Sequence, residues 1–276
     1  MLAKIHPTWR RLEIPDGYTY TAFAIDLNTS YAITVSGVCF RPDTTAHVIY
    51  HETIPCKIPA DTPDGLYNTR VHEALADVFK RLKALGVPIH GCAIDAGGRN
   101  ADVVQAFCKS AATQGIPCCA FFGRAANMWN PQVKSRLREA INNTVLCGSP
   151  EEHIKAGAGT KWILWNADHY KECAQRALIS PLGAIGSTSL YHGEIEEHKD
   201  FALQVTNEKL RYIQYKAGRD IYHWTQSGSA HDYGDTLAMC HAVAASQGIS
   251  GATVAESISR PRVQRHRPQR PRIRII

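Results

Sequence analysis

Three aspartates stand at positions where a carboxylate can do chemistry. Asp26 and Asp95 each follow an apolar run directly, in AFAID and GCAID, and Asp235 stands near the start of the apolar stretch HDYGDTLAMCHAVAAS. In α/β proteins, ligands bind at the carboxyl ends of core strands, and if these two strands are neighbours Asp26 and Asp95 lie side by side. Carboxylates held together repel one another, so such a group is stable chiefly with a cation, and Mg²⁺ or Mn²⁺ suits an all-oxygen site.

Each aspartate also has a structural interpretation. Asp26 precedes LNTS and Asp95 precedes AGG, and aspartate is common in turns. Asp235 in the first turn of a helix would interact favourably with the free N–H groups and the helix dipole, with Asp232 as the N-cap. These explanations account for each residue separately. They do not explain why two aspartates at strand ends are followed along the sequence by a third at the start of a helix.

The elements that would position the aspartates follow from the hydrophobic pattern. Alternating residues at 18–26, 31–40 and 46–54 predict an antiparallel meander. A helix is expected over 66–86, because Val71, Leu75, Val78, Leu82 and Leu85 recur at helical spacing and Gly86 is a suitable stop. Next come a strand, a helix and a strand, at 89–95, 100–115 and 117–123, which is the pattern of parallel pairing.

The second half gives weaker signals. Two short strands are predicted at 143–148 and 160–166, and two helices at 167–178 and 194–206. A hairpin is predicted at 210–226, with its turn near KAGRD. A last helix begins close to Asp235. Together these elements predict an α/β fold of one domain, with a mixed sheet (an antiparallel N-terminal meander plus parallel strands) flanked by helices.

The order of these motifs over residues 18–246 resembles the nuclease domain of the phage terminase large subunit, in particular the lambda-type group of the ribonuclease H-like superfamily. AIDLNTSYAITVSGVCF is similar to its first strand and hairpin, and AIDAGGRNADVVQAFC to its second motif. WNADHYKECAQRAL resembles its lysine-containing helix, with Lys171 at the lysine position. Thr206 and Glu208 match a T-x-E before a hairpin that ends in Trp224, and HDYGDTLAMCHAVAA matches the last motif.

The resemblance implies a metal-dependent endonuclease that cuts concatemeric viral DNA during genome packaging. It places Asp26, Asp95 and Asp235 in the metal-binding catalytic triad, with two Mg²⁺ or Mn²⁺ ions about 4 Å apart and Asp26 bridging both. It makes double-stranded DNA the substrate, and a packaging ATPase, small terminase subunit or portal protein the expected partner. The candidates to contact DNA phosphates are His231, Lys171, Arg99 and Arg124.

Two departures from the family pattern are evident. The chain has no G-x-x-x-x-G-K-[ST] phosphate loop and no room for the family's ATPase domain, so we expect an excised or separately encoded nuclease domain, or a relative that no longer drives packaging. Where relatives often carry a Lys-Gly pair after the second motif, this sequence has FFGRAANMWN, in which Arg124 would supply the positive charge.

Charge and composition define the domain limits. The 276 residues include 31 basic and 25 acidic side chains, but the last seventeen, RPRVQRHRPQRPRIRII, hold seven arginines and no acid, so the rest has 24 basic against 25 acidic residues. We expect an N-terminal extension at 1–17, the nuclease domain at 18–250 and a flexible basic tail at 251–276, either simply solvated or an arm for phosphates or an acidic partner.

Compartment and redox state follow from absent signals. The sequence has no apolar run long enough to span a membrane and no signal peptide, so we expect a cytoplasmic protein, in the host cytoplasm if viral, with no membrane partner. The nine cysteines have irregular spacing and no C-x-x-C pair, and are expected to be reduced and mostly buried, with Cys118 and Cys119 in a strand.

Two other functions remain open from the sequence. An actin-like ATPase or kinase also places aspartates at strand ends, and DAGG would suit its nucleotide loop, but such enzymes have two copies of the core and only one is evident here. A catalytically silent ribonuclease H-like module that binds DNA or a capsid component is the non-enzymatic alternative. Saturable ATP binding without DNA would indicate the first, and absence of Mn²⁺ binding the second.

Overall fold

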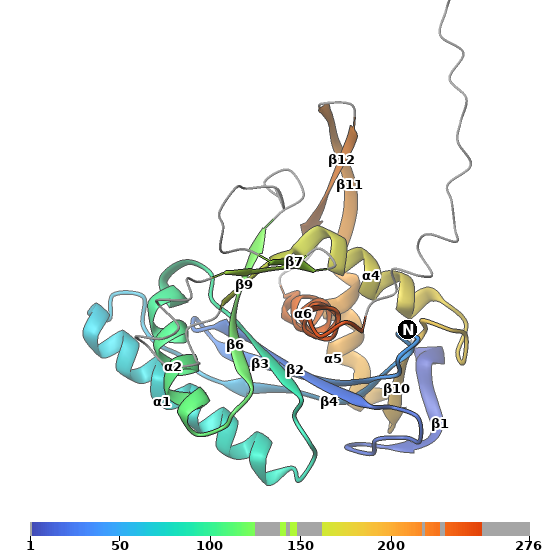
Figure 1. Ribbon diagram of the computed structural model, residues 1–276, viewed down its shortest axis with the longest axis horizontal. Coiled ribbons are helices and arrows are strands. Elements are labelled where there is room, and N and C mark those ends of the chain that lie inside the picture. Colours follow the sequence, from blue (N-terminus) through green and yellow to red (C-terminus); the bar gives the residue numbers. More distant parts are fainter. Residues whose placement is uncertain are drawn as a thin grey trace, which may run out of the picture.

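The central feature of the computed structural model is a ten-stranded mixed sheet (Figure 1). The structure describes residues 2–124, 139–141, 144–147, 162–216, 219–226 and 230–249. Strands β2 (Tyr20–Asn28), β3 (Ala32–Phe40) and β4 (Ala46–Pro55) form the antiparallel meander. On the β2 side the sheet continues with parallel β5 (Gly91–Asp95), β6 (Cys118–Arg124) and β9 (Trp162–Asn166), and then with antiparallel β8 (Thr144–Cys147) and β7 (Glu139–Ile141).

On the other side of the meander the sheet gains two parallel strands. Strand β10 (Thr188–His192) pairs with β4, and β1 (Ile5–Arg10) pairs with β10 at the edge. Because β1, β10, β4, β2, β5, β6 and β9 run in the same direction, their carboxyl ends meet at one edge of the sheet. The predicted class, a mixed α/β sheet flanked by helices, is confirmed.

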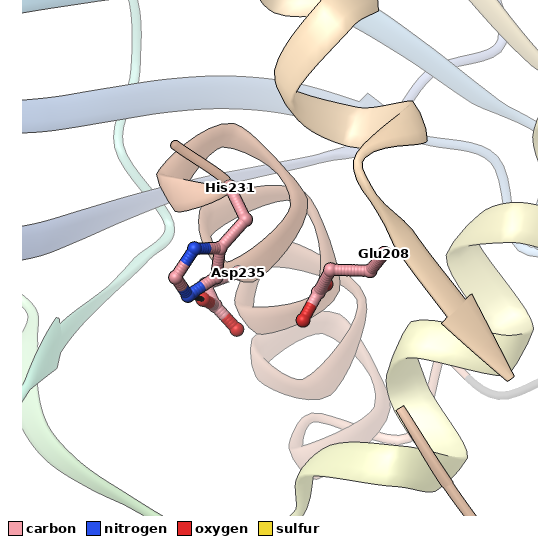
Figure 2. A group of neighbouring side chains, drawn as sticks. All are labelled: Glu208, His231 and Asp235. Carbon is pink, nitrogen blue, oxygen red and sulfur yellow. Dashed lines mark ion pairs between the residues drawn. The ribbon is translucent and has the colours of Figure 1, made fainter. Parts of the chain in front are cut away.

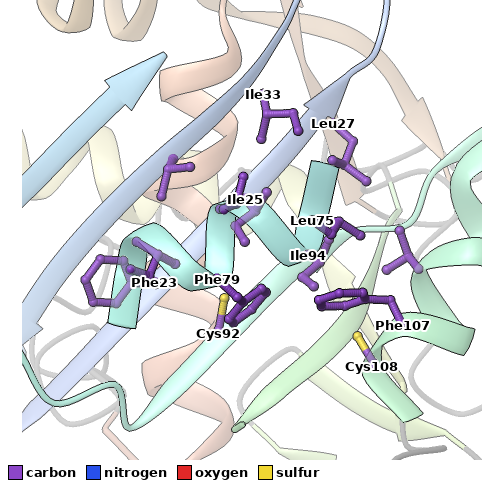
Figure 3. Close-up of a cluster of buried hydrophobic side chains, with 14 of the residues drawn as sticks. Phe23, Ile25, Leu27, Ile33, Leu75, Phe79, Cys92, Ile94, Phe107 and Cys108 are labelled. Carbon is purple, nitrogen blue, oxygen red and sulfur yellow. The ribbon is translucent and has the colours of Figure 1, made fainter. Parts of the chain in front are cut away.

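Helices cover both faces. Helices α1 (Asp64–Ala84) and α2 (Ala101–Thr113) lie on one face over an apolar core that includes Phe23, Ile25 and Ile94 (Figure 3). Helices α4 (Ala167–Ile179), α5 (Ile195–Thr206) and α6 (Asp232–Ser246) cover the other (Figure 1). Helix α6 is almost wholly buried and lies directly on β2 and β3. This burial explains its apolar sequence, since most of its circumference contacts protein.

A separate two-stranded sheet projects from this body (Figure 1). It consists of β11 (Glu208–Lys216) and β12 (Arg219–Gln226), close to the predicted hairpin. Two residues of the predicted turn, 217–218, and the whole of the predicted tail, 251–276, lie outside the described residues.

Three strands of the large sheet, β1, β7 and β10, are absent from the sequence prediction. Strand β10 is only five residues long, and β1, IHPTWR, contains a proline, which weakens a strand pattern and is tolerated at a sheet edge. Residues assigned to an N-terminal extension at 1–17 therefore include an edge strand of the sheet. Eight of the nine cysteines have described side chains, and these eight are free thiols; Cys118 and Cys119 lie in β6. None of the described helices combines the length and apolarity that a membrane span requires.

Candidate active site

Strand register brings the first two aspartates together. Ile25 of β2 pairs with Ile94 of β5 in parallel register, so Asp26 and Asp95 follow at adjacent positions on neighbouring strands. Both lie at the edge where the carboxyl ends of the parallel strands meet. The expectation that these residues are neighbours rests on a parallel β2–β5 pair, and the structure contains that pair.

Asp235 joins them from the opposite direction. Helix α6 crosses β2 and β3, held by a hydrogen bond of 2.7 Å between the hydroxyls of Ser36 and Thr236. Burial raises the pKa of Asp26 well above its ordinary value, and the carboxylates of Asp235 and Asp95 raise it further. The carboxylates of Asp235 and Asp95 thus lie near enough to Asp26 to act on it electrostatically, although 209 positions separate Asp26 from Asp235 in the sequence.

The start of α6 differs from the prediction. His231, not Asp232, is the N-cap residue, and its side chain makes no capping bond. Asp232 instead accepts a hydrogen bond from the hydroxyl of Tyr31, and the amide oxygen of Gln204 accepts one from the N–H of Tyr233 at 3.2 Å. The helix start is thus satisfied by neighbouring elements, which leaves Asp235, one turn in, to face the site.

A buried lysine, Lys171, links Asp235 to Glu208. Glu208 has no role in the sequence prediction beyond its place in a T-x-E motif. Nζ of Lys171 lies 2.6 Å from Oδ1 of Asp235 and 2.5 Å from Oε1 of Glu208. The Lys171 side chain is 12% exposed and that of Glu208 only 5%. On the other side, Nε2 of His231 lies 3.3 Å from Oδ2 of Asp235 (Figure 2). Lys171 therefore contacts two carboxylates in this structure, and its contact with DNA phosphate stays a prediction.

The two partners of Lys171 keep its positive charge in place. Burial lowers the pKa of Lys171, but the carboxylates of Asp235 and Glu208 outweigh this effect, so that its pKa is raised overall. Burial raises the pKa of Glu208, and the Lys171 ammonium opposes that rise. Lys171 is thus a cation held between the carboxylates of Asp235 and Glu208, and its charge also opposes the rise in the pKa of Asp26.

The two predicted arginines lie at the margin of the site. Arg99 donates to Oδ1 of Asp64 at 2.7 Å and to the carbonyl oxygen of Ala60 at 3.1 Å, and its guanidinium lies 3.9 Å from the centre of the Tyr67 ring. These contacts attach Arg99 to the loop before α1 and to the first turn of α1, and its contact with DNA phosphate stays a prediction. Arg124 is exposed at the carboxyl end of β6, where it remains a candidate.

The donor set fits a divalent cation. Glu208, His231 and Asp235 each offer a ligand atom within 4.8 Å of the others, and Asp26 and Asp95 add carboxylate oxygens at the strand ends. Four carboxylates outnumber the single ammonium of Lys171, and the raised pKa values of Asp26 and Asp95 record the cost of their negative charge. A hard cation would relieve this repulsion, as Mg²⁺ or Mn²⁺ prefers oxygen ligands.

The metal-free protein is expected to lose stability as the pH rises, because of Asp95. Burial raises the pKa of Asp95 to about 6, the Asp235 carboxylate adds to this, and the backbone N–H groups of Gly97 and Ala96 oppose it. A pKa raised in the folded state favours folding below the ordinary value of about 4, and this contribution, about 3 kcal/mol, is lost as the pH rises to about 6.

Urea unfolding in EDTA, compared between wild type and Asp95→Asn from pH 4 to pH 7.5, isolates this contribution. The free energy of unfolding of the wild type should fall relative to the variant over that range. Parallel curves for the two proteins would contradict the assignment of a buried, proton-binding carboxylate to Asp95.

Comparison with known proteins gives a family match. A family model described as "Terminase large subunit gpA, endonuclease domain" matches residues 1–256. No curated protein matches the sequence. Among solved structures, the nuclease domain of the large terminase subunit gp2 of bacterial virus Sf6 is similar at 11% identity and a TM-score of 0.44, covering 82% of this chain and 89% of that one.

Two other solved structures are similar to the chain. Thermus thermophilus RuvC in complex with a Holliday junction substrate shows 12% identity and a TM-score of 0.35, covering 83% of this chain and 97% of that one. The large terminase from a thermophilic bacteriophage shows 11% identity and a TM-score of 0.33, covering 83% of this chain and 41% of that one. A mutant of the Sf6 domain is described with manganese and beta-thujaplicinol.

Proposed function

This chain belongs to the family of terminase large subunit gpA endonuclease domains, and from that membership we propose that it is an Mg²⁺- or Mn²⁺-dependent DNA endonuclease that cuts concatemeric viral DNA during packaging. Two observations support this most directly: Asp26 and Asp95 lie at adjacent positions on parallel strands, and the Asp235 carboxylate raises the pKa of Asp26. Three half-buried carboxylates from distant parts of the sequence, with the ammonium of Lys171 beside one of them, are costly to fold unless they bind a cation.

Asp26, Asp95 and Asp235 would hold the two ions; Asp26 lies beside Asp95 on the neighbouring strand, and the Asp235 carboxylate raises the pKa of Asp26. The chemistry that such cations supply is activation of a water for attack on phosphorus and stabilisation of the leaving 3′-oxygen. The protein's part is to fix the carboxylates: the sheet positions Asp26 and Asp95, and α6, with Lys171 and His231, orients Asp235. Arg124 and His231 are the proposed DNA phosphate contacts.

Cleavage of supercoiled plasmid tests the proposal. The protein should nick plasmid with Mg²⁺ or Mn²⁺ and lose this activity in EDTA, and calorimetric titration should detect saturable Mn²⁺ binding. A folded protein that binds no Mn²⁺ would instead fit the catalytically silent DNA- or capsid-binding module. ATP binding that saturates without DNA would favour the actin-like ATPase.

Family membership also suggests the setting of this reaction. We propose that the chain acts on double-stranded DNA in the host cytoplasm, together with a packaging ATPase, a small terminase subunit or a portal protein. Contacts to the DNA backbone do not depend on sequence, so binding should fall steeply with salt.

Removal of residues 260–276 is expected to weaken DNA binding, because this segment carries seven arginines and no acid. The slope of log K against log salt should become shallower by about 0.9 for each phosphate that the protein no longer neutralises. Filter binding from 50 to 300 mM salt measures the slope, and Mn²⁺ titration serves as the control because the predicted ligands lie upstream. An unchanged slope would show that the arginines are solvated and do not contact DNA. Loss of Mn²⁺ binding would contradict the prediction that the tail and the metal site are separate.

A further inference from the structure

We propose that Glu208 is a positioning residue of this active site, which holds the ammonium of Lys171 against Asp235. The proposal rests on the function proposed above, because it concerns the carboxylate that would bind metal. It goes beyond that function because it assigns a role to Glu208, which is neither one of the strand-end aspartates, Asp26 and Asp95, nor a residue of α6.

The first argument is the geometry of the contacts. A lysine side chain is long and flexible, and a single carboxylate does not fix its ammonium group. Here Nζ of Lys171 lies between Oε1 of Glu208, at 2.5 Å, and Oδ1 of Asp235, at 2.6 Å. Because His231 approaches Oδ2 at 3.3 Å, both oxygens of Asp235 have a neighbour (Figure 2). The orientation of the Asp235 carboxylate is therefore set from two sides, and Glu208 secures one of them.

The second argument is the space provided for Glu208. A Cβ atom added to Gly234 of α6 would lie 3.2 Å from Oε2 of Glu208, closer than most such contacts in proteins. A glycine one residue before Asp235 thus lets the carboxylate of Glu208 approach the helix. The Glu208 side chain reaches the site because α6 carries no side chain at this position.

The third argument is that Glu208 and Lys171 stand on elements fixed to each other. Glu208 is the first residue of β11 and pairs with Gln226 of β12. Two residues before Gln226, the backbone N–H of Trp224 donates to Oδ1 of Asp168 at 3.2 Å, and its indole N–H donates to the Asp168 carbonyl at 3.1 Å. Asp168 lies in the first turn of α4, three residues before Lys171. The base of the hairpin is therefore attached to the helix that carries the lysine.

These contacts predict two consequences of removing the Glu208 side chain. Without it, Lys171 loses one of two anchors and its ammonium moves more freely, even in metal-free protein. The metal affinity also falls, because Asp235 loses a fixed orientation and the site loses a negative charge. Groups that orient metal ligands typically account for 10- to 100-fold in affinity, so we expect a loss of roughly this size.

The experiment compares wild type, Glu208→Ala and Glu208→Gln with the control Glu196→Ala, which removes an exposed acid from α5. Acetylation by acetic anhydride, read by peptide mass spectrometry in EDTA, reports the freedom of Lys171, with exposed Lys209 as internal reference. Titration with Mn²⁺ reports metal affinity, and circular dichroism verifies folding. Glu208→Gln is informative because the amide oxygen still accepts a hydrogen bond from Nζ.

We expect Glu208→Ala to raise the acetylation of Lys171 several-fold and to weaken Mn²⁺ binding by roughly 10- to 100-fold. Glu208→Gln should restore most of the protection and part of the affinity, and Glu196→Ala should resemble wild type. Equal acetylation of Lys171 in wild type and folded Glu208→Ala would overturn the proposal. Failure of the wild type to bind Mn²⁺ would refute the proposed function instead, while the acetylation result would still decide the role of Glu208.

Discussion

Replacement of Asp26 by asparagine is expected to reduce metal-dependent plasmid nicking by roughly 1,000-fold and to leave the fold intact. Asp26 lies beside Asp95 on the neighbouring strand, and the Asp235 carboxylate raises its pKa, so its charge stands at the centre of the proposed metal site. Asparagine keeps the shape and one oxygen but loses the charge that binds the cation. A loss of about 4 kcal/mol of transition-state stabilisation, the scale of metal assistance, corresponds to this factor.

The same substitution should make the metal-free protein more stable at pH 8. Burial and the neighbouring carboxylates raise the pKa of Asp26, so the ionised form opposes folding, and a neutral amide removes this cost. The thermal transition in EDTA should therefore rise, whereas the stabilisation by Mn²⁺ seen with wild type should disappear. A gain in stability together with a loss of activity indicates a functional carboxylate. Removal of a carboxylate with a purely structural role would instead lower the stability of the folded protein.

Asp77→Asn is the matched control, since it makes the same chemical change at an exposed position of α1 on the other face of the sheet. It should leave nicking, Mn²⁺ binding and the thermal transition nearly unchanged. Wild-type nicking by a well-folded Asp26→Asn protein would exclude this cluster as the catalytic centre. A loss of folding would instead show that Asp26 accepts hydrogen bonds essential to the sheet.

Much of the site's arrangement could be predicted because it depends on local pattern. Apolar runs that end in Asp26 and Asp95 indicate buried strands, and their carboxylates lie side by side if the two strands are neighbours, as the parallel pair β2–β5 is. Asp235 could be placed through its motif, because an apolar helix buried against the sheet leaves few orientations for its first turn. The strands β1 and β10 escaped prediction, since a proline and a length of five residues remove the alternation on which such prediction relies.

The environment of Lys171 could not be predicted for a different reason. Its partners lie 37 and 64 positions away along the chain, on the hairpin base and on α6, and no local pattern encodes a meeting of three separate elements. A lysine on a helix suggests a solvated cation or a phosphate contact. Only the docking of the hairpin on α4 turns it toward carboxylates. Arg99 likewise meets a distant partner, since Asp64 lies 35 positions earlier in the sequence.

Lys171→Met should lower the free energy of unfolding of the metal-free protein by about 3 kcal/mol. Methionine has a similar length and fills the space of the aliphatic part of lysine, so the change mainly removes the charge. Glu208, only 5% exposed, and Asp235 then remain as buried anions without their ammonium partner. Breaking a buried ion pair on one side typically costs 3 to 5 kcal/mol, and the partial exposure of Asp235, 23%, places the expectation at the lower end.

The dependence on metal distinguishes this explanation from a packing defect. A divalent cation supplies positive charge to the same carboxylates, so saturating Mn²⁺ should recover a substantial part of the stability lost in Lys171→Met, whereas a cavity would not respond to the ion. Urea unfolding of the variant and of the control Lys209→Met, at an exposed position of β11, with and without Mn²⁺ measures this. Equal stabilities of the two variants in EDTA would contradict a buried ion pair, and an unchanged deficit in Mn²⁺ would separate Lys171 from the metal site.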